Sequence, residues 1–170
     1  ILFLHNPRND IEDFDGVIQF MNALKVAGKI KFKGVSLAKN YNYSEEFLKE
    51  FDFIQDDGNL LDMRFLNLKL PSNSKFMARS PLASGILSGK ITNNSVFPPG
   101  DHRSAWLKEE RLNSIMKRVD RINEVSNIEL IDLSKKFILS NKKINKVIFG
   151  IKSTQHMDGI LQTSPLALNK

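Results

Sequence analysis

Polar residues stand at the ends of five apolar, strand-like segments of this 170-residue chain. In chain order they are His5-Asn6, Ser36, Gln55, Arg79-Ser80 and the run at 150–153. A histidine such as His5 can act as a general acid or base, or donate a hydrogen bond to a substrate oxygen. Because chemistry in βα architectures gathers at the carboxyl ends of strands, the five polar ends together predict a functional site.

The run Gly-Ile-Lys-Ser-Thr at 150–154 joins the last predicted strand to a helix. Backbone N–H groups at a helix start and the helix dipole favour an anion, and Lys152 adds a full positive charge. In barrels the loops after the last two strands often form a phosphate site. An ordinary serine-capped helix accounts for the same residues equally well, so both interpretations stay open at this point.

Two other groups of ionisable residues do not indicate a site of their own. Asp56 and Asp57 are adjacent, and adjacent strand residues point to opposite faces, so we expect no carboxylates sharing a proton. His102 and His156 lack a histidine or carboxylate partner at a metal-ligand spacing, and the chain has no cysteine. We therefore expect no metal site, no disulfide and no thiolate chemistry.

Strands and helices are predicted to alternate along the chain. The strands are expected at 1–5, 31–36, 52–55, 75–80 and 146–149, and the helices at 14–26, 44–51, 59–70, 106–123, 128–139 and from 153 to before Pro165. Strands that are apolar throughout indicate an α/β fold, a parallel sheet covered by helices. Five βα units fit either an open doubly wound sheet or part of a (β/α)8 barrel. No Gly-x-Gly-x-x-Gly follows the first strand, so a Rossmann fold loses its main support.

Length and composition limit the classes of protein that the chain can belong to. Residues 1–170 fit a single domain, and no apolar run approaches the roughly 20 residues of a membrane helix. The formal net charge is +6, but the lysines are scattered, so we expect an anionic cofactor rather than nucleic acid. The expected location is cytoplasmic. The first residue is Ile1, already inside a predicted strand, which suggests a fragment.

Eight short segments, in this order and spacing, resemble the second half of the aldo-keto reductases. They are Leu-His-Asn-Pro at 4–7, Gly-Val-Ser at 34–36, Ile-Gln at 54–55, Asn-Leu-Leu-Asp at 59–62, Ala-Arg-Ser-Pro-Leu-Ala-Ser-Gly-Ile-Leu-Ser-Gly-Lys at 78–90, Phe97, Asp-His-Arg at 101–103 and Ile-Phe-Gly-Ile-Lys-Ser at 148–153. The segment 78–90 is the most specific. The resemblance covers essentially the whole chain and corresponds to barrel strands four to eight.

The resemblance implies a partial (β/α)8 TIM barrel with about five parallel strands, and NADPH bound without a Rossmann fold. Hydride would pass to an aldehyde or ketone while a tyrosine protonates the forming alkoxide. By the same resemblance, His5 would orient the carbonyl group, and Ser36 and Gln55 would hold the nicotinamide carboxamide. The remaining cofactor-binding residues that we expect are Ser80, Pro81, Leu82 and Ser84 along the pyrophosphate, and Gly150, Lys152 and Ser153 near the ribose 2′-phosphate.

Several residues depart from the family's pattern. Leu37 stands where the family usually has an Asn that contacts the carboxamide. His156 and Ile160 stand where a Gln and an Asn usually face the adenosine, and Gly159 replaces a common Glu. A glycine inside a helix costs about 1 kcal/mol relative to alanine. The stretch between Asn59 and Ala78 is also several residues short.

The family's catalytic Asp, Tyr and Lys belong to barrel strands one to three, which this chain does not contain. We therefore expect a reductase fragment that is inactive alone. The alternative is a non-catalytic binding or interaction module on a half-barrel scaffold. In either case the open sheet edges predict self-association, or pairing with the missing N-terminal half.

Overall fold

The computed structural model describes residues 1–8, 11–39 and 41–162. Contacts divide the chain into two compact units. The first unit contains residues 1–57, 64–79 and 142–147, and the second contains 58–63, 80–141 and the described residues from 148 onward. The expectation of a single domain stays a prediction.

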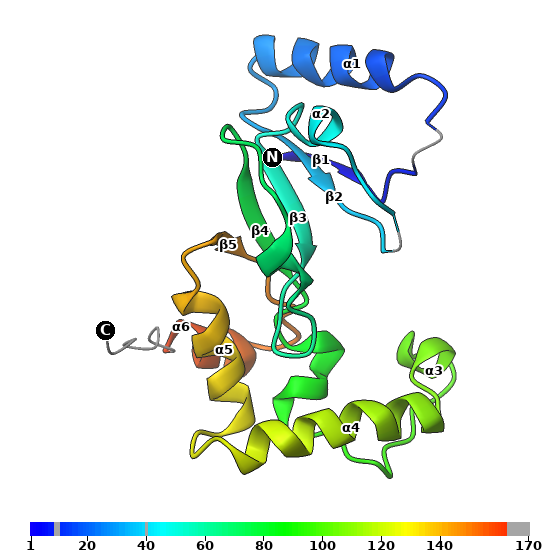
Figure 1. Ribbon diagram of the computed structural model, residues 1–170, viewed down its shortest axis with the longest axis vertical. Helices are drawn as coiled ribbons and strands as arrows, with labels where there is room; N and C mark the ends of the chain where they lie inside the picture. The colour runs from blue at the N-terminus through cyan, green and yellow to red at the C-terminus, as the bar shows by residue number, and fades with distance from the viewer. Residues whose placement is uncertain (9–10, 40, 163–170) are drawn as a thin grey trace. The chain divides into compact units, whose positions relative to one another are not determined.

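Five parallel strands form one sheet in the first unit (Figure 1). They are β1 (Leu2–His5), β2 (Lys33–Ser36), β3 (Phe53–Asp57), β4 (Lys75–Arg79) and β5 (Ile144–Val147), paired in chain order. This confirms the predicted α/β fold of alternating strands and helices. A doubly wound sheet reverses its strand order at a switch point, so a strictly sequential order favours the barrel of the two predicted architectures.

Two helices of the first unit cover the sheet near β1, β2 and β3 (Figure 1). Helix α1 (Phe14–Val26) begins at Asp13, whose side chain accepts the Gly16 N–H at 2.8 Å. Helix α2 (Glu45–Leu48) begins at Ser44, which caps it as the sequence predicts. The core of this unit consists of apolar side chains that α1, α2 and the strands share. Its buried members are Ile18, Met21, Val35, Leu37, Leu48, Phe51 and Ile54.

A glycine in β2 makes room for an aromatic ring of β1. Gly34 pairs with Phe3 in the parallel register. A Cβ atom at position 34 would collide with the Phe3 ring. The Phe3 ring therefore lies over the bare backbone of its neighbour, which explains a glycine inside a strand.

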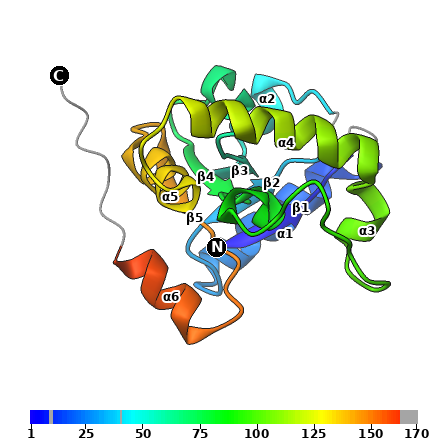
Figure 2. The ribbon, with the colours of Figure 1, turned by 90° about the horizontal axis from the view of Figure 1, so that it is seen from below.

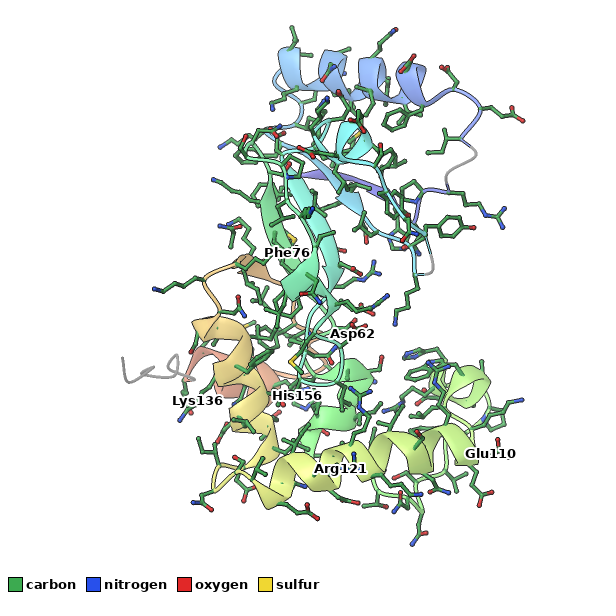
Figure 3. All side chains as sticks on the ribbon, in the orientation of Figure 1. Asp62, Phe76, Glu110, Arg121, Lys136 and His156 are labelled. Atoms are coloured by element: carbon green, nitrogen blue, oxygen red, sulfur yellow. The ribbon has the colours of Figure 1, made fainter. Side chains whose placement is uncertain are left out.

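The segment 59–70 is not the helix that the sequence predicts. It contains only a short 3-10 helix, η1 (Arg64–Asn67), preceded by a bridge between Asn59 and Asp62. Phe65 of η1 stacks on Phe76 of β4, with ring centroids 5.4 Å apart (Figure 3 labels Phe76). The Lys143 amine donates to the Leu68 carbonyl and also to that of Leu66, at 2.8 Å for the latter. These backbone acceptors are thus satisfied by a side chain, without a longer helix.

The second unit is helical. It contains η2 (Ala83–Ser88), α3 (Arg103–Trp106), α4 (Glu109–Glu124), α5 (Leu130–Ser140) and α6 (Thr154–Leu161). The predicted helix 106–123 begins three residues late, because Leu107 and Lys108 leave the helical conformation and Glu109 and Glu110 start the next helix. Figure 2 shows α5 beside the end of α4. The core of this unit is Ile86, Leu87, Ile91, Leu107, Leu112, Met116, Val119 and Leu130.

Strand β5 lies two residues earlier than the predicted 146–149. The reason is local: the Asn145 side-chain oxygen accepts the Phe76 N–H at 2.8 Å, and the pairing of β4 with β5 shifts register there. Among the described residues, no helix is both long enough and apolar enough to span a bilayer.

Candidate functional site

Ser36, the last residue of β2, lies beside Gln55 in the middle of β3, which continues two residues beyond the predicted strand end at Gln55. They are register partners in the parallel sheet, and both are buried, with 1% and 8% of their surface exposed. The Ser36 hydroxyl donates to the Gln55 side-chain oxygen at 2.9 Å. The Gln55 amide nitrogen contacts the Met77 thioether at 3.4 Å and meets no oxygen acceptor among the described residues. A strong donor is thus paired only with a weak acceptor.

Arg79, the last residue of β4, joins this pair although the sequence analysis did not place it among the cofactor residues. Its guanidinium donates to the Ser36 hydroxyl and, at 2.8 Å, to the Leu37 carbonyl. Its Nε donates to Asp57 at 2.9 Å. A signal for this contact exists in the sequence, because Asp57 and Arg79 each end a strand and oppose one another when β3 and β4 pair in parallel.

Asp57 is a buried carboxylate with two cationic neighbours. Its side chain is 7% exposed, and Lys39 reaches it at 2.6 Å. Burial opposes the charged form, but the hydrogen bonds from Lys39 and Arg79 outweigh it and hold the pKa of Asp57 below its usual value. The adjacent Asp56 differs, since burial raises the pKa of its carboxyl group. The Asp56 side chain accepts the Asp57 N–H at 2.7 Å.

His5 ends β1 and is the register partner of Ser36. Its side chain is exposed. The next residue, Asn6, adopts a left-handed conformation with φ 49° and donates its N–H to the Ser36 carbonyl at 2.8 Å. The structure therefore brings His5, Ser36 and Gln55 to one edge of the sheet, as the sequence predicts; their roles stay predictions.

The predicted pyrophosphate residues Ser80, Pro81, Leu82 and Ser84 lie in the second unit. The Asn59 amide donates to the Ser80 carbonyl at 3.0 Å. Pro81 is buried, and Leu82 packs against the core of this unit. Ser84 is exposed. The segment is therefore anchored by its apolar residues, while Ser84 lies at the surface.

Gly150, Lys152 and Ser153 precede α6, also in the second unit. Ser153 caps the helix, because its hydroxyl accepts the His156 N–H at 3.3 Å (Figure 3 labels His156). Gly150 and Lys152 are exposed. The predicted serine cap is confirmed, and the affinity of this helix start for an anion stays a prediction.

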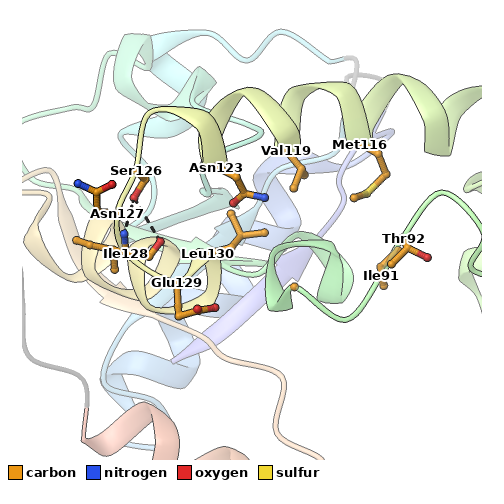
Figure 4. Close-up of a pocket in the computed structure, with 11 residues that line it drawn as sticks. Ile91, Thr92, Met116, Val119, Asn123, Ser126, Asn127, Ile128, Glu129 and Leu130 are labelled. Carbon is orange, nitrogen blue, oxygen red and sulfur yellow. Dashed lines mark hydrogen bonds between the residues drawn. The ribbon is translucent and has the colours of Figure 1, made fainter.

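The described residues line a groove in the second unit and a smaller cavity in the first unit. A groove of about 510 Å³ in the second unit has a floor of Ile91, Met116, Val119 and Leu130 and a polar rim that includes Asn123 (Figure 4). None of the predicted site residues lines it. A smaller cavity of about 180 Å³ in the first unit is lined by residues that include Leu37, Tyr43 and Asp56.

No three His, Cys, Asp or Glu side chains in the described part of the chain are grouped as metal ligands.

The chain is similar to known proteins both in sequence and in structure. The model of the aldo/keto reductase family matches residues 1–170. No curated protein sequence matches the chain. Among solved structures, a glycerol dehydrogenase from Gluconobacter oxydans is 20% identical with a TM-score of 0.64, covering 99% of this chain and 61% of that protein.

An aldo-keto reductase from Bacillus halodurans is similar in two forms. The apo form is 21% identical with a TM-score of 0.68, and the holo form 22% identical with a TM-score of 0.67. They cover 98% and 97% of this chain but only 57% and 56% of that protein. The chain thus spans less than two thirds of the length of these structures. The likeness shows the fold, an α/β arrangement that matches part of a TIM barrel.

We predict that Arg79→Ala destabilises the first unit by about 3 kcal/mol at neutral pH, since it leaves a buried carboxylate with one cationic partner fewer. The folded pKa of Asp57 is lowered, so its contribution to stability is present above its unfolded value near 3.9 and is lost as pH falls through the folded value. The difference between wild type and variant should therefore shrink below about pH 4. Urea unfolding at neutral and acidic pH measures it.

Arg121→Ala is the matched control, because Arg121 is an exposed arginine on α4 (Figure 3). We expect it to change stability by less than about 0.5 kcal/mol at either pH. Equal effects of the two substitutions would contradict the importance of the Arg79–Asp57 pair.

Proposed function

Because the chain belongs to the aldo/keto reductase family, we propose that it is the C-terminal, cofactor-binding part of an NADPH-dependent reductase. The observation that supports this most is the buried, hydrogen-bonded Ser36–Gln55 pair on two neighbouring strands of the sheet. The complete enzyme would convert an aldehyde or ketone to an alcohol. When bound, NADPH supplies the hydride for that reduction.

The polar pair suits a carboxamide. A carboxamide offers one oxygen acceptor and an NH2 donor group. The Gln55 amide nitrogen, which now contacts only a thioether, can donate to that oxygen, and the Ser36 hydroxyl can accept from the NH2 group. Because the pair is buried, a ligand that leaves one of these polar groups unpaired loses free energy of binding. Burial therefore makes the pair selective for a group that matches both hydrogen bonds.

The second unit supplies the groups for the phosphates. The exposed Lys152 ammonium and the start of α6 favour a dianionic group, such as the ribose 2′-phosphate that distinguishes NADPH from NADH. The segment 80–84 would lie along the pyrophosphate, as the family resemblance implies. Leu37 weakens the site, since it is 4% exposed and packs in the core instead of offering an amide to the cofactor.

Catalysis needs a proton donor that this chain's own tyrosines do not provide. The Tyr43 hydroxyl donates to the Pro7 carbonyl at 2.6 Å and accepts the Ala38 N–H at 3.0 Å. Burial raises the pKa of Tyr43, which makes it a weaker acid. His5, exposed at the end of β1, would orient the substrate carbonyl.

A non-catalytic binding module is the second candidate. The buried Leu37 favours it, together with His156 and Ile160 on α6 in place of the family's amide side chains. The two candidates differ in one respect: a reductase part becomes active when the missing half is supplied, and a binding module does not.

The edges of the sheet indicate a protein partner. In the sheet β1 pairs only with β2, and Ile1 and Leu2 are 46% and 36% exposed. An open apolar edge strand favours pairing with another chain. We propose that the isolated chain associates with itself through this edge, or with a chain that carries the missing half.

We predict that Lys152→Ala lowers the affinity for NADPH about tenfold and leaves that for NADH nearly unchanged, because one charged hydrogen bond to the 2′-phosphate is worth about 1.5 kcal/mol or more. Calorimetric titration of the two cofactors measures this. Lys117→Ala, which removes an exposed lysine from α4, is the control for net charge. An equal loss with both cofactors, or with both variants, would argue against a 2′-phosphate contact.

We predict negligible carbonyl reduction by the chain alone. The expected result with NADPH and a broad panel of aldehydes is no turnover above a reaction without protein. Supplying the first three barrel strands of a related reductase, fused or as a second chain, should restore turnover, and His5→Ala should then lower it. Turnover by the isolated chain at the rate of a complete enzyme would refute the proposal.

We predict that the isolated chain is a dimer or larger in light scattering at micromolar concentration. Leu2→Lys places a charge on the β1 edge and should shift the equilibrium towards monomer. Val26→Lys, on an α1 residue that is 90% exposed, should not. A strictly monomeric wild-type chain would rule this association out.

A further inference from the structure

The segment that follows β4 adopts a backbone conformation that its residue types disfavour. Ser80, Ala83 and Ser84 have φ values of 54°, 47° and 58°, and Gly85 has 92°. For residues other than glycine this left-handed region costs roughly 1–2 kcal/mol each. Ala83 and Ser84 occupy it consecutively, so other contacts must hold the segment in place.

Arg103 provides such a contact from the other end of the following loop. Its Nη1 donates to the Ser84 carbonyl at 3.4 Å. Gly85 has a φ of 92°, which favours glycine, and a Cβ atom there would make an ordinary van der Waals contact with the same nitrogen, at 3.5 Å. The guanidinium group thus lies against Ser84 and Gly85, the two residues with the largest positive φ values in the turn.

The guanidinium is itself fixed by two neighbours. Asp101 receives Nε at 2.9 Å and Nη2 at 2.6 Å, a two-point ion pair. The Phe97 ring lies 4.6 Å from the guanidinium carbon. The hydrogen bonds from Arg103 hold the pKa of Asp101 well below its usual range, so the pair persists in mildly acidic solution.

We infer that Arg103 is a positioning residue, which holds the left-handed backbone of residues 83–85 ready for the phosphates of the cofactor. This inference rests on the proposed function. All three guanidinium nitrogens have partners and the charge is balanced by Asp101, so Arg103 acts through the Ser84 backbone rather than as a direct phosphate ligand. Holding the segment in its bound shape beforehand strengthens binding by lowering the cost of ordering it.

Two substitutions separate positioning from direct charge. Arg103→Gln removes the charge and the two-point contact, and Arg103→Lys keeps the charge but cannot form the two-point contact. If Arg103 positions the backbone, both variants should bind 2′,5′-ADP about tenfold more weakly than wild type, which corresponds to about 1.4 kcal/mol. If Arg103 touched phosphate directly, the lysine variant would keep most of the affinity, and the inference would be overturned.

Hydrogen exchange without any ligand tests the same contact independently of the proposed function. The amides of Ala83, Gly85 and Leu87 donate to carbonyls within the turn at 2.9, 2.9 and 3.2 Å. We expect their exchange to accelerate about tenfold in both Arg103 variants, while the amides inside α4 keep their protection. Unchanged exchange at the turn would overturn the positioning role, whether or not the chain binds a nucleotide.

A rescue variant distinguishes positioning from general loss of stability. Glycine adopts the left-handed region without penalty, so Ala83→Gly should reduce the effect of Arg103→Gln on both exchange and 2′,5′-ADP affinity. Asp101→Asn, which keeps the arginine but weakens its anchor, should resemble Arg103→Gln in milder form. Additive effects of Ala83→Gly and Arg103→Gln would overturn the inference. A further outcome is that the wild-type chain binds no nucleotide while the variants show that protection of the turn depends on Arg103. That result would refute the proposed function and leave the positioning role standing.

Discussion

The ion pair between Asp57 and Arg79 determines the arrangement of the polar residues in the first unit. An ionised carboxylate is costly to bury without a partner, so the Asp57 side chain requires a cation within reach. Parallel pairing of β3 with β4 places Arg79 directly beside it. Once held there, the guanidinium extends to β2 and donates to Ser36, which in turn donates to Gln55. The orientation of the polar pair therefore follows from the burial of one charge, that of Asp57, which lies on the same strand as Gln55.

The two units contain the same arrangement of an aspartate, an arginine and a backbone carbonyl group. In each, an aspartate neutralises an arginine, and a remaining N–H of that arginine donates to a backbone carbonyl. Arg79 holds the Leu37 carbonyl just after β2, and Arg103 holds the Ser84 carbonyl in the turn after β4. Arginine suits this task because its planar group carries five donors with fixed geometry. A loop held in this way needs no regular secondary structure of its own.

The sequence predicts those parts of the structure that depend on local patterns. Helix α1 spans the residues that its apolar spacing indicates, and Ser44 and Ser153 cap helices as their types suggest. The strand order follows from the alternation of elements, since parallel strands joined by helices leave few topologies. The family resemblance adds the barrel, because the order of the segments rather than any single motif carries it.

What the sequence did not predict depends on pairs of distant residues. The partnership of Arg79 with Asp57 needs the register of β3 against β4, which local pattern does not contain. The shortness of the stretch between Asn59 and Ala78 already indicates a reduced helix at 59–70, but not that Lys143, more than seventy residues away, donates to carbonyl groups of that segment. The left-handed turn at Ala83 and Ser84 contradicts the preference of both residue types, and it is held by hydrogen bonds within the turn and by Arg103 from the far end of the following loop.

The contact between Gly34 and Phe3 has a consequence for the evolution of this sheet. The space above position 34 is filled by the Phe3 ring, so a larger residue there requires that ring to move or a smaller residue at position 3. The two positions should consequently covary among relatives, with an aromatic ring on one strand accompanied by glycine on the next. A larger residue at position 34 alone collides with the Phe3 ring, and a smaller residue at position 3 alone leaves an unfilled space. A compensating exchange at both positions preserves the packing of β1 against β2.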